Sequence, residues 1–173
     1  GLLYDLGSHL ADQALLLFGP ADRVYASARA LRSPNIADDD TLITIEHSSG
    51  VISELAVSVL APHKAPRFRV LGNKAGLVID GLDEQEAQLK DGHLPKDDQW
   101  GVTARVAEIH HGDEPMRTLS IDRGRWDLFY PAVTASILGH GELPVSPQSA
   151  IATIDLLERA AISARSGQWV SCN

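Results

Sequence analysis

The chain has 173 residues, of which 44% are hydrophobic and 22% charged, with a formal net charge of -8 at pH 7. This length is sufficient for one domain with a hydrophobic core. The acidic balance and the scattered basic residues argue against a nucleic-acid partner. No apolar run approaches the ~18 residues of a membrane-spanning helix, which argues against a membrane partner. We therefore expect a single domain over residues 1–173.

Cysteine usage and the start of the sequence bear on its compartment. Cys172 is the only cysteine, so no disulfide can form within the chain. Nothing at the start resembles a signal peptide, and both observations are typical of a cytoplasmic protein. The sequence has no initial methionine and opens directly on its most informative segment. We therefore expect a fragment of a longer protein.

The first nineteen residues, GLLYDLGSHLADQALLLFG, combine an apolar run with three polar positions. Asp5, His9 and Asp12 are spaced i, i+4, i+7, so they share one face of a helix with about 3.6 residues per turn. Gly19 followed by Pro20 predicts the end of that helix. A carboxylate therefore lies one turn from an imidazole, on an element that we expect to be largely buried.

Three interpretations of this pair stay open at the level of spacing alone. A buried His bonded to a carboxylate is often structural, because ion-pair networks occur without any catalytic role. Two carboxylates and one imidazole could approach a metal-ligand set, although one His is missing and the chain has no H-E-x-x-H or C-x-x-C spacing. A catalytic role is the third, since His with its ordinary pKa of about 6.5 can accept a proton near neutral pH.

An alternating pattern typical of β-strands begins after Pro20. Strands are predicted over residues 23–32, 41–47, 51–61, 67–71, 77–79 and 117–121. A three-residue turn, residues 48–50, joins the second of these to the third as an antiparallel hairpin. A second hairpin passes through Gly72 and Gly76. One open, mainly antiparallel sheet is therefore expected.

Helices are predicted in the rest of the chain. A short helix over residues 83–89 precedes an exposed loop that Trp100 anchors. A second helix covers residues 127–138, and a third begins after Ser146 as N-cap and ends at Gly167. Residues expected to face the core are Phe129, Val133, Ile137 and Leu138, and then Ile151, Ile154, Leu156, Leu157, Ala161 and Ile162.

Runs of strands flanked by helices predict an α+β fold, with helices layered on one face of an open sheet. Residues 51–61 carry apolar side chains at both alternating positions, so the other face of the sheet also requires a cover. We therefore expect a homodimer or higher oligomer, formed sheet on sheet.

The opening segment from Leu3 to Asp12, LYDLGSHLAD, closely resembles the start of the C-terminal domain of the glucose-fructose oxidoreductase, inositol dehydrogenase and MocA family. The hairpin VLGNKAG that begins at Val70 resembles a strand-turn hairpin of that family. Phe129-Tyr130 and the LPVS sequence that ends at Ser146 resemble the family's ending. The resemblance covers essentially the whole chain.

The resemblance implies a glyceraldehyde-3-phosphate-dehydrogenase-like domain for substrate binding and oligomerisation, within an NAD(P)-dependent oxidoreductase of two domains. NAD or NADP would be bound mainly by an N-terminal Rossmann domain that is absent from this sequence, because no strand here leads through G-x-G-x-x-G into a helix. The family's catalytic lysine, in a Glu-Lys-Pro motif, is also absent. We expect this chain alone to be inactive.

Asp5 and His9 coincide with the family's catalytic Asp and His, which implies that His9 takes the hydroxyl proton of a sugar, a polyol or a related small molecule. Asp5 would fix the imidazole tautomer, and Asp12 would support the helix. Substrate-binding candidates are Tyr130, His63 and Arg67. No cofactor or metal ligand is expected in this chain. The alternative is a non-catalytic binding or dimerisation module in which the Asp-His pair is structural.

Overall fold

The structure is a computed structural model that describes residues 1–34 and 36–172. The chain divides into two compact units, Gly1–Pro62 with Val145–Asn173 and His63–Pro144. Each unit contains its own four-stranded antiparallel sheet. The α+β class is confirmed, but the expected single sheet is wrong. The proline-containing segment after residue 61 interrupts the strands, because proline cannot donate to a sheet ladder.

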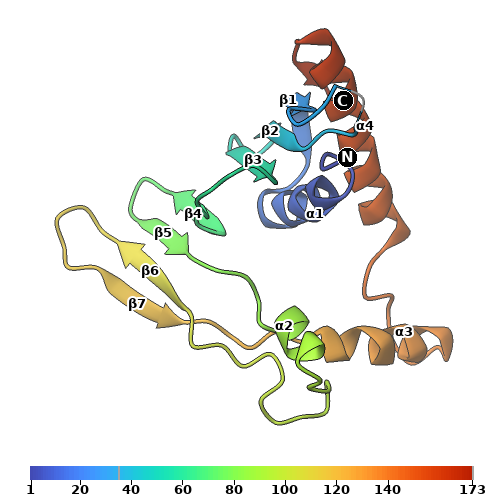
Figure 1. The fold of residues 1–173 in the computed structure, drawn as a ribbon. Coiled ribbons are helices and arrows are strands. Elements are labelled where there is room, and N and C mark those ends of the chain that lie inside the picture. The colour runs from blue at the N-terminus through green and yellow to red at the C-terminus, as the bar shows by residue number, and fades with distance from the viewer. Residues whose placement is uncertain (35, 173) are drawn as a thin grey trace. The chain divides into compact units, whose positions relative to one another are not determined.

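The first unit is a sheet covered by two helices. Its elements are α1 (Leu6–Phe18), β1 (Ala21–Arg29), β2 (Asp40–His47), β3 (Ile52–Ser58), α4 (Pro147–Ser166) and β8 (Val170–Ser171). The strand order is β3-β2-β1-β8, and all neighbours are antiparallel. The predicted hairpin of β2 and β3 is confirmed. Strand β8, near the end of the chain, lies beside the first residues of β1, so α4 and β8 return to the sheet formed by the first part of the chain (Figure 1).

The core of the first unit lies between its sheet and its helices. Val24 and Ala26 of β1 are in register with Ile45 and Ile43 of β2, so these side chains point to the same face of the sheet. Small residues of α1 and the Leu156 region of α4 pack onto that face. Full burial of each branched side chain stabilises the fold by about 1.5–3 kcal/mol.

The ends of α4 form as the sequence predicts, but its buried face is different. Ser146 accepts a hydrogen bond from the backbone N–H of Ser149 at 3.0 Å, and Gly167 ends the helix at φ 67°. Ile151 and Ile154, expected in the core, are 66% and 49% exposed. Ser163 is instead fully buried, where its hydroxyl oxygen accepts from the N–H of Ala26 at 2.9 Å. A polar contact to β1 therefore helps to set the rotation of α4.

The second unit holds the other sheet and three short helical elements. These are β4 (Phe68–Leu71), β5 (Gly76–Ile79), α2 (Gln85–Lys90), β6 (Val106–His110), β7 (Arg117–Ser120), the 3-10 turn η1 (Trp126–Leu128) and α3 (Phe129–Ile137). The sheet order is β4-β5-β6-β7. Strand β6 was not predicted, because one of its faces mixes Val106 with Glu108 and His110, and only Ala107 and Ile109 mark the other face as apolar.

Helix α3 was expected to face a core, and this expectation is wrong. None of its described residues is buried, and Phe129 and Ile137 are 45% and 78% exposed. Within its unit α3 packs chiefly against the preceding turn η1. An apolar stripe is buried only when a second element covers it, which the stripe itself does not specify.

Two side chains of α2, those of Gln85 and Gln88, bind loop segments of the second unit by hydrogen bonds, and we call this group the Gln85 clasp. Trp100 and Gln85 are each 1% exposed, which confirms Trp100 as an anchor. The side-chain amide oxygen of Gln85 accepts the N–H of Trp126 at 2.8 Å, and that of Gln88 accepts the N–H of Gly101 at 2.8 Å. These bonds hold the segments around Gly101 and Trp126, which lie outside the strands and so make no ladder hydrogen bonds.

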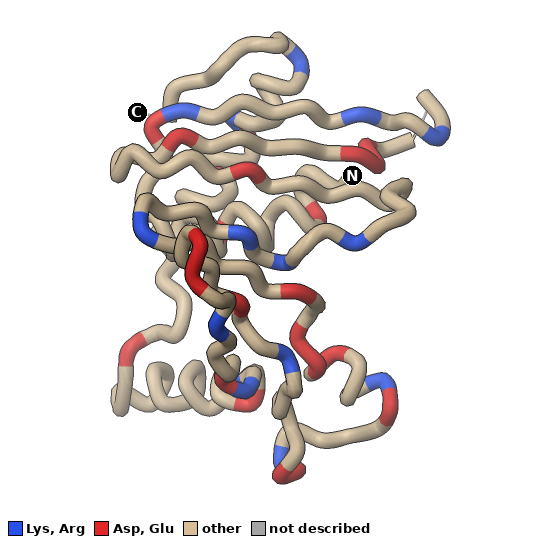
Figure 2. Tube along the Cα trace, turned by 90° about the vertical axis from the view of Figure 1, so that its left-hand side faces the viewer, with Lys and Arg blue, Asp and Glu red and all other residues tan. Residues whose placement is uncertain are grey.

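Charged residues of both signs are interspersed along the chain, and no long basic stretch stands out (Figure 2). Several are joined in ion pairs on the outward face of the first unit's sheet, such as Arg23 with Glu46 and Arg29 with Asp40, each at 2.6 Å. Among the described helices, none combines the length and the apolar character that a bilayer-spanning helix requires.

Candidate active site

Helix α1 presents its polar stripe to solvent. Its buried residues are Gly7, Ala11 and Ala14. Asp5, His9 and Asp12 lie about half a turn away from these positions and are exposed. The helix was expected to be largely buried, but its buried residues are these three small ones, and the polar stripe is on its exposed side. The helix is buried along its small residues, because only they allow its backbone to approach the sheet closely.

Gly7 shows how closely α1 approaches its neighbours. A Cβ atom at this position would lie 3.2 Å from the carbonyl oxygen of Leu2 and 3.6 Å from Cδ1 of Ile43. The first contact is tighter than ordinary van der Waals packing, so glycine suits this position. The buried Gly7 fixes which side of α1 faces the sheet. It thereby directs Asp5 and His9 outward.

The side chains of Asp5 and His9 carry no hydrogen bond to each other or to another protein group within residues 1–34 and 36–172. Asp5 is the residue before the helix, and its side chain makes no capping bond. Its carbonyl oxygen accepts the hydroxyl of Ser8 at 2.6 Å. Catalytic hydrogen bonds are often long or absent without substrate, so this geometry is compatible with an acid-base pair.

Asp12 connects the two helices of the first unit. The hydroxyl of Thr153 on α4 lies 3.3 Å from Oδ1 of Asp12 and 3.2 Å from the carbonyl oxygen of Ser149. A hydroxyl has one hydrogen, so the two acceptors share it. This contact suits the supporting role expected of Asp12.

The segment that precedes α1 is held by a residue that the sequence did not single out. Asp38 accepts the N–H of Leu2 at its carbonyl oxygen, at 3.0 Å, and the N–H of Leu3 at Oδ2, at 2.7 Å. Asp38 belongs to three successive aspartates in the loop before β2. The three aspartates were the only sequence signal for this role, and they do not show that Asp38 bonds to Leu3, which lies 35 residues away in sequence.

The other two aspartates stabilise the same loop. Asp39 is 1% exposed and accepts the N–H of Leu31 at 2.8 Å and the guanidinium Nε of Arg32 at 2.8 Å. The Leu31 hydrogen bond, followed by the Arg32 guanidinium, lowers the pKa of Asp39 below its ordinary range. The hydrogen bond from Arg29 likewise lowers the pKa of Asp40.

The three substrate-binding candidates belong to the second unit and are described within it alone. Tyr130 on α3 is 77% exposed, and its ring meets that of Phe129 edge to face at 5.4 Å. His63 is exposed, whereas Arg67 is half-buried with its guanidinium 5.3 Å from the ring centre of Phe68. Burial lowers the pKa of Arg67.

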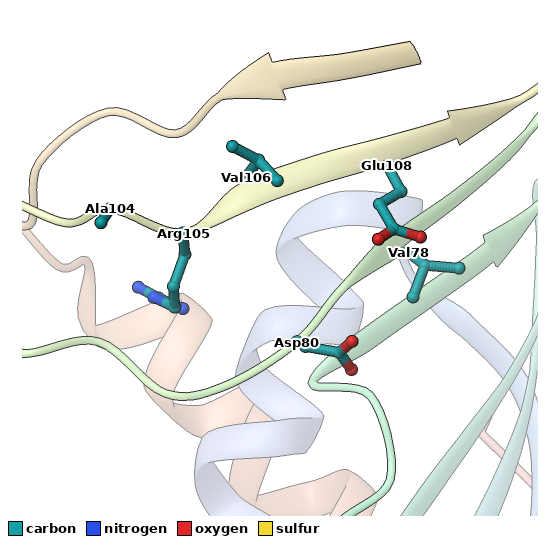
Figure 3. A pocket seen from close by; sticks show the side chains of 6 residues that line it. All are labelled: Val78, Asp80, Ala104, Arg105, Val106 and Glu108. Atoms are coloured by element: carbon teal, nitrogen blue, oxygen red, sulfur yellow. The ribbon is translucent and has the colours of Figure 1, made fainter. Parts of the chain in front are cut away.

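A shallow pocket of about 190 Å³ lies on the polar side of the second unit's sheet (Figure 3). Its lining is Val78, Asp80, Ala104, Arg105, Val106 and Glu108. Arg105 is engaged by Glu84 at 3.3 Å, so its charge is already compensated. Small-molecule sites usually span about 300–1,000 Å³. Asp5 and His9 belong to the other unit, so we do not assign the pocket to their chemistry.

Within residues 1–34 and 36–172, neither the glycine turns nor the acidic and histidine side chains form a site of the kind that holds a dinucleotide or a metal ion. Gly72 and Gly76 lie at the turn of the β4–β5 hairpin, and Gly139 and Gly141 follow α3, so none opens a helix onto a pyrophosphate. Across residues 1–34 and 36–172, no three His, Cys, Asp or Glu side chains gather closely enough to hold a metal.

The fold and the exposed Asp-His helix together define an α+β domain with one candidate acid-base face. A sequence model described as "Oxidoreductase family, C-terminal alpha/beta domain" (GFO_IDH_MocA_C) matches residues 1–172. The chain belongs to the glucose-fructose oxidoreductase, inositol dehydrogenase and MocA family, as a C-terminal domain, which confirms the resemblance.

Individual relatives agree with this assignment. The scyllo-inositol 2-dehydrogenase (NADP(+)) IolW of Bacillus subtilis (strain 168) is 30% identical, over 95% of this chain and 47% of its own length. The uncharacterized oxidoreductase YdgJ of Escherichia coli (strain K12) is 32% identical, over 95% of this chain and 48% of its own. A Klebsiella pneumoniae structure classed as an oxidoreductase has a TM-score of 0.92 and 30% identity, covering 99% of this chain and 49% of that chain. This chain therefore spans about half the length of these relatives.

Proposed function

We propose that the chain is the substrate-binding and oligomerisation domain of an NAD(P)-dependent oxidoreductase that acts on a sugar, a polyol or a related hydroxy compound by hydride transfer. The observation that carries this proposal is the outward-facing Asp5-His9 pair on α1. The relative IolW, whose name gives an inositol as its substrate and NADP(+) as its cofactor, supports the substrate class. NAD or NADP would be held by residues outside this chain.

The chemistry assigned to the pair is a proton transfer. A carbinol carbon that loses hydride must also lose its hydroxyl proton, and a neutral imidazole is suited to accept it. In this proposal Nδ1 or Nε2 of His9 takes that proton. The Asp5 carboxylate, one turn earlier, orients the ring and stabilises the imidazolium that forms.

The second candidate is a non-catalytic binding or dimerisation module in which the pair is structural. A structural carboxylate-imidazole pair is normally buried and hydrogen-bonded, since burial gives it a stabilising role. The exposure of Asp5 and His9, without a bond to the described residues, favours the catalytic proposal.

The test uses the protein encoded by the intact gene. His9→Ala and Asp5→Asn are expected to lower turnover by about 10²–10⁴-fold, the range for a lost acid-base group, and to leave nucleotide affinity nearly unchanged. His140→Ala, at an exposed position after α3, is the matched control and should retain activity. Unchanged turnover in the His9 and Asp5 variants would make the pair structural.

The gene itself offers a cheaper test. The DNA upstream of the codon for Gly1 should encode a Rossmann fingerprint and a Glu-Lys-Pro motif. A reading frame that begins at Gly1 would contradict the enzymatic proposal. The lone Cys172 is compatible with the reducing, cytoplasmic location that we propose for this enzyme.

We further propose a homodimer or higher oligomer through the outward face of the first unit's sheet. On that face Tyr25 pairs with Thr44, and Leu42, which is 40% exposed, pairs with Ala56. The ion pairs of Arg23 and Arg29 lie on either side of this less charged centre. Glu54 of β3, in register with Thr44, adds a charge to this face, and charged residues around a less charged centre are typical of protein interfaces.

Sedimentation of the intact protein tests this interface. The wild-type protein should sediment as a dimer or larger species at micromolar concentration, and Leu42→Arg should shift it to monomer because a charge would be buried at the contact. Leu89→Arg, on an exposed position of α2, is the control. A wild-type protein that stays monomeric at this concentration would exclude the proposed oligomer.

A further inference from the structure

We infer that Asp38 is a positioning residue that fixes the start of α1 and so aims Asp5 and His9. This inference rests on the proposed function of the pair. Asp38 lies in the loop before β2, and its contacts with the segment before α1 all belong to the first unit. Its contacts with this segment run through the main chain of Leu2 and Leu3, so we infer that it acts on the pair through the backbone of residues 2–7.

Two hydrogen bonds join Asp38 to that segment. Its carbonyl oxygen accepts the N–H of Leu2 at 3.0 Å, and its carboxylate Oδ2 accepts the N–H of Leu3 at 2.7 Å. The carboxylate bond is short and charge-assisted, which makes it stronger than a bond between neutral groups. Adjacent residues are thus held by the main chain and the side chain of one aspartate.

The restraint continues from these residues into the helix. Leu2 and Leu3 are 8% and 3% exposed, so their side chains also fix the segment. The carbonyl oxygen of Leu2 then accepts the N–H of Gly7 at 2.8 Å. Gly7 lies between Asp5 and His9 on α1. A displacement of Leu2 therefore moves the turn that carries both side chains.

Asp38 is itself anchored to the sheet. The hydroxyl of Thr41, which is 4% exposed, donates to Oδ2 of Asp38 at 2.9 Å. The next residue, Asp39, donates its backbone N–H to the carbonyl oxygen of Arg29 at 2.8 Å. These bonds tie the loop to the ends of β1 and β2. Because the Asp38 carboxylate is fixed to the sheet, the residues bonded to it, and α1 after them, are fixed relative to the sheet.

The position of Gly1 independently shows that the segment before α1 lies very close to Asp38. A Cβ atom on Gly1 would lie 2.7 Å from the backbone nitrogen of Asp38 and would also collide with its carboxylate. No larger residue fits there without movement of the main chain. The segment before α1 is therefore pressed directly against Asp38, as a positioning contact requires.

The experiment compares Asp38→Ala with Asp113→Ala in the protein encoded by the intact gene. Asp113 is an exposed aspartate in the loop after β6, so it is the control for the loss of one carboxylate. Asp38→Ala is expected to lower kcat by about 100-fold, the effect of a displacement near 1 Å, with little change in nucleotide Kd. The NMR signal of the His9 ring should also move in Asp38→Ala and stay in place in Asp113→Ala.

The outcomes separate this inference from the proposed function. A loss of kcat together with a displaced His9 signal supports the positioning role. A His9 signal that does not move overturns it, whatever the turnover. A displaced signal with unchanged turnover in both Asp38→Ala and His9→Ala contradicts the proposed function, but it still shows that Asp38 places the helix.

A milder variant covers the case in which Asp38→Ala does not fold. Thr41→Val keeps the size of the buried side chain and removes only the donor that anchors the Asp38 carboxylate. It should change kcat and the His9 signal in the same direction, by a smaller factor. Wild-type values of both in a folded Thr41→Val would count against the anchoring of Asp38.

Discussion

The hydroxyl of Thr153 on α4 donates a hydrogen bond to Oδ1 of Asp12 on α1, at an oxygen–oxygen distance of 3.3 Å. Thr153 is 6% exposed, so its hydroxyl has little access to water. Thr153→Val should lower the free energy of unfolding by about 1 kcal/mol, the net value of a typical hydrogen bond. Urea unfolding measures the change. Thr134→Val, at an exposed site on α3, should have a smaller effect.

Gly124 lies directly against the Gln85 clasp of the second unit. A Cβ atom there would collide with the side chains of Gln85 and Asp83, and Gln85 is too deeply buried to move freely. Gly124→Ala should therefore destabilise the protein by about 1–3 kcal/mol, the usual cost of overpacking. The thermal midpoint would report it. Gly141→Ala, where the nearest side-chain atom is 3.6 Å away, should be close to neutral.

Asp39 should make stability depend on pH in the acid range. Its folded pKa is lowered below the ordinary 3.8, chiefly by the N–H of Leu31 and then by Arg32. The folded state therefore favours the ionised carboxylate. The stabilisation is present above the unfolded pKa and is lost as pH falls from about 4 through the folded pKa. Denaturant unfolding at pH 7 and at pH 3 should show this loss.

The matched variants isolate that contribution. Asp39→Asn should be less stable than wild type at pH 7, and the gap should narrow at pH 3, because below the ordinary pKa of 3.8 the unfolded chain gains a proton that the folded carboxylate resists. Asp113→Asn, in the exposed loop after β6, controls for the change in net charge. A gap for Asp39→Asn that is equally large at both pH values would show that ionisation contributes nothing.

Cys172 should react slowly with thiol reagents in the folded protein. Burial raises the pKa of its thiol above the ordinary 9.0 and so reduces the thiolate fraction near neutral pH. Its backbone N–H is bonded to the carbonyl oxygen of Asp22 at 2.8 Å, which holds the chain beside β1. Alkylation at pH 7 should be much faster in urea than in buffer. Equal alkylation rates in urea and in buffer would indicate that the Cys172 thiol is accessible to the reagent in the folded protein.

Features that depend on neighbouring residues were determined by the sequence. The N-cap Ser146 and the terminal Gly167 define α4, and the turn at Gly50 joins β2 to β3, because capping and turn geometry are local. The spacing likewise placed His9 and Asp12 on one exposed face of α1, with Asp5 as the residue directly before the helix. The opening motif was specific enough to identify the family before any fold was known.

Only the tertiary structure decided which faces are buried and which distant residues meet. The sequence placed Ile151 in the core, where it is not found, and it did not show that α1 is buried along Gly7, Ala11 and Ala14 while Asp5 and His9 are exposed. Periodicity defines a face, but its burial depends on the element packed against it. Asp38 reaches Leu3 only because the loop before β2 folds back onto the start of α1. A contact between residues 35 apart cannot be read from local spacing, whereas the helix that it holds in place is encoded by its own 13 residues.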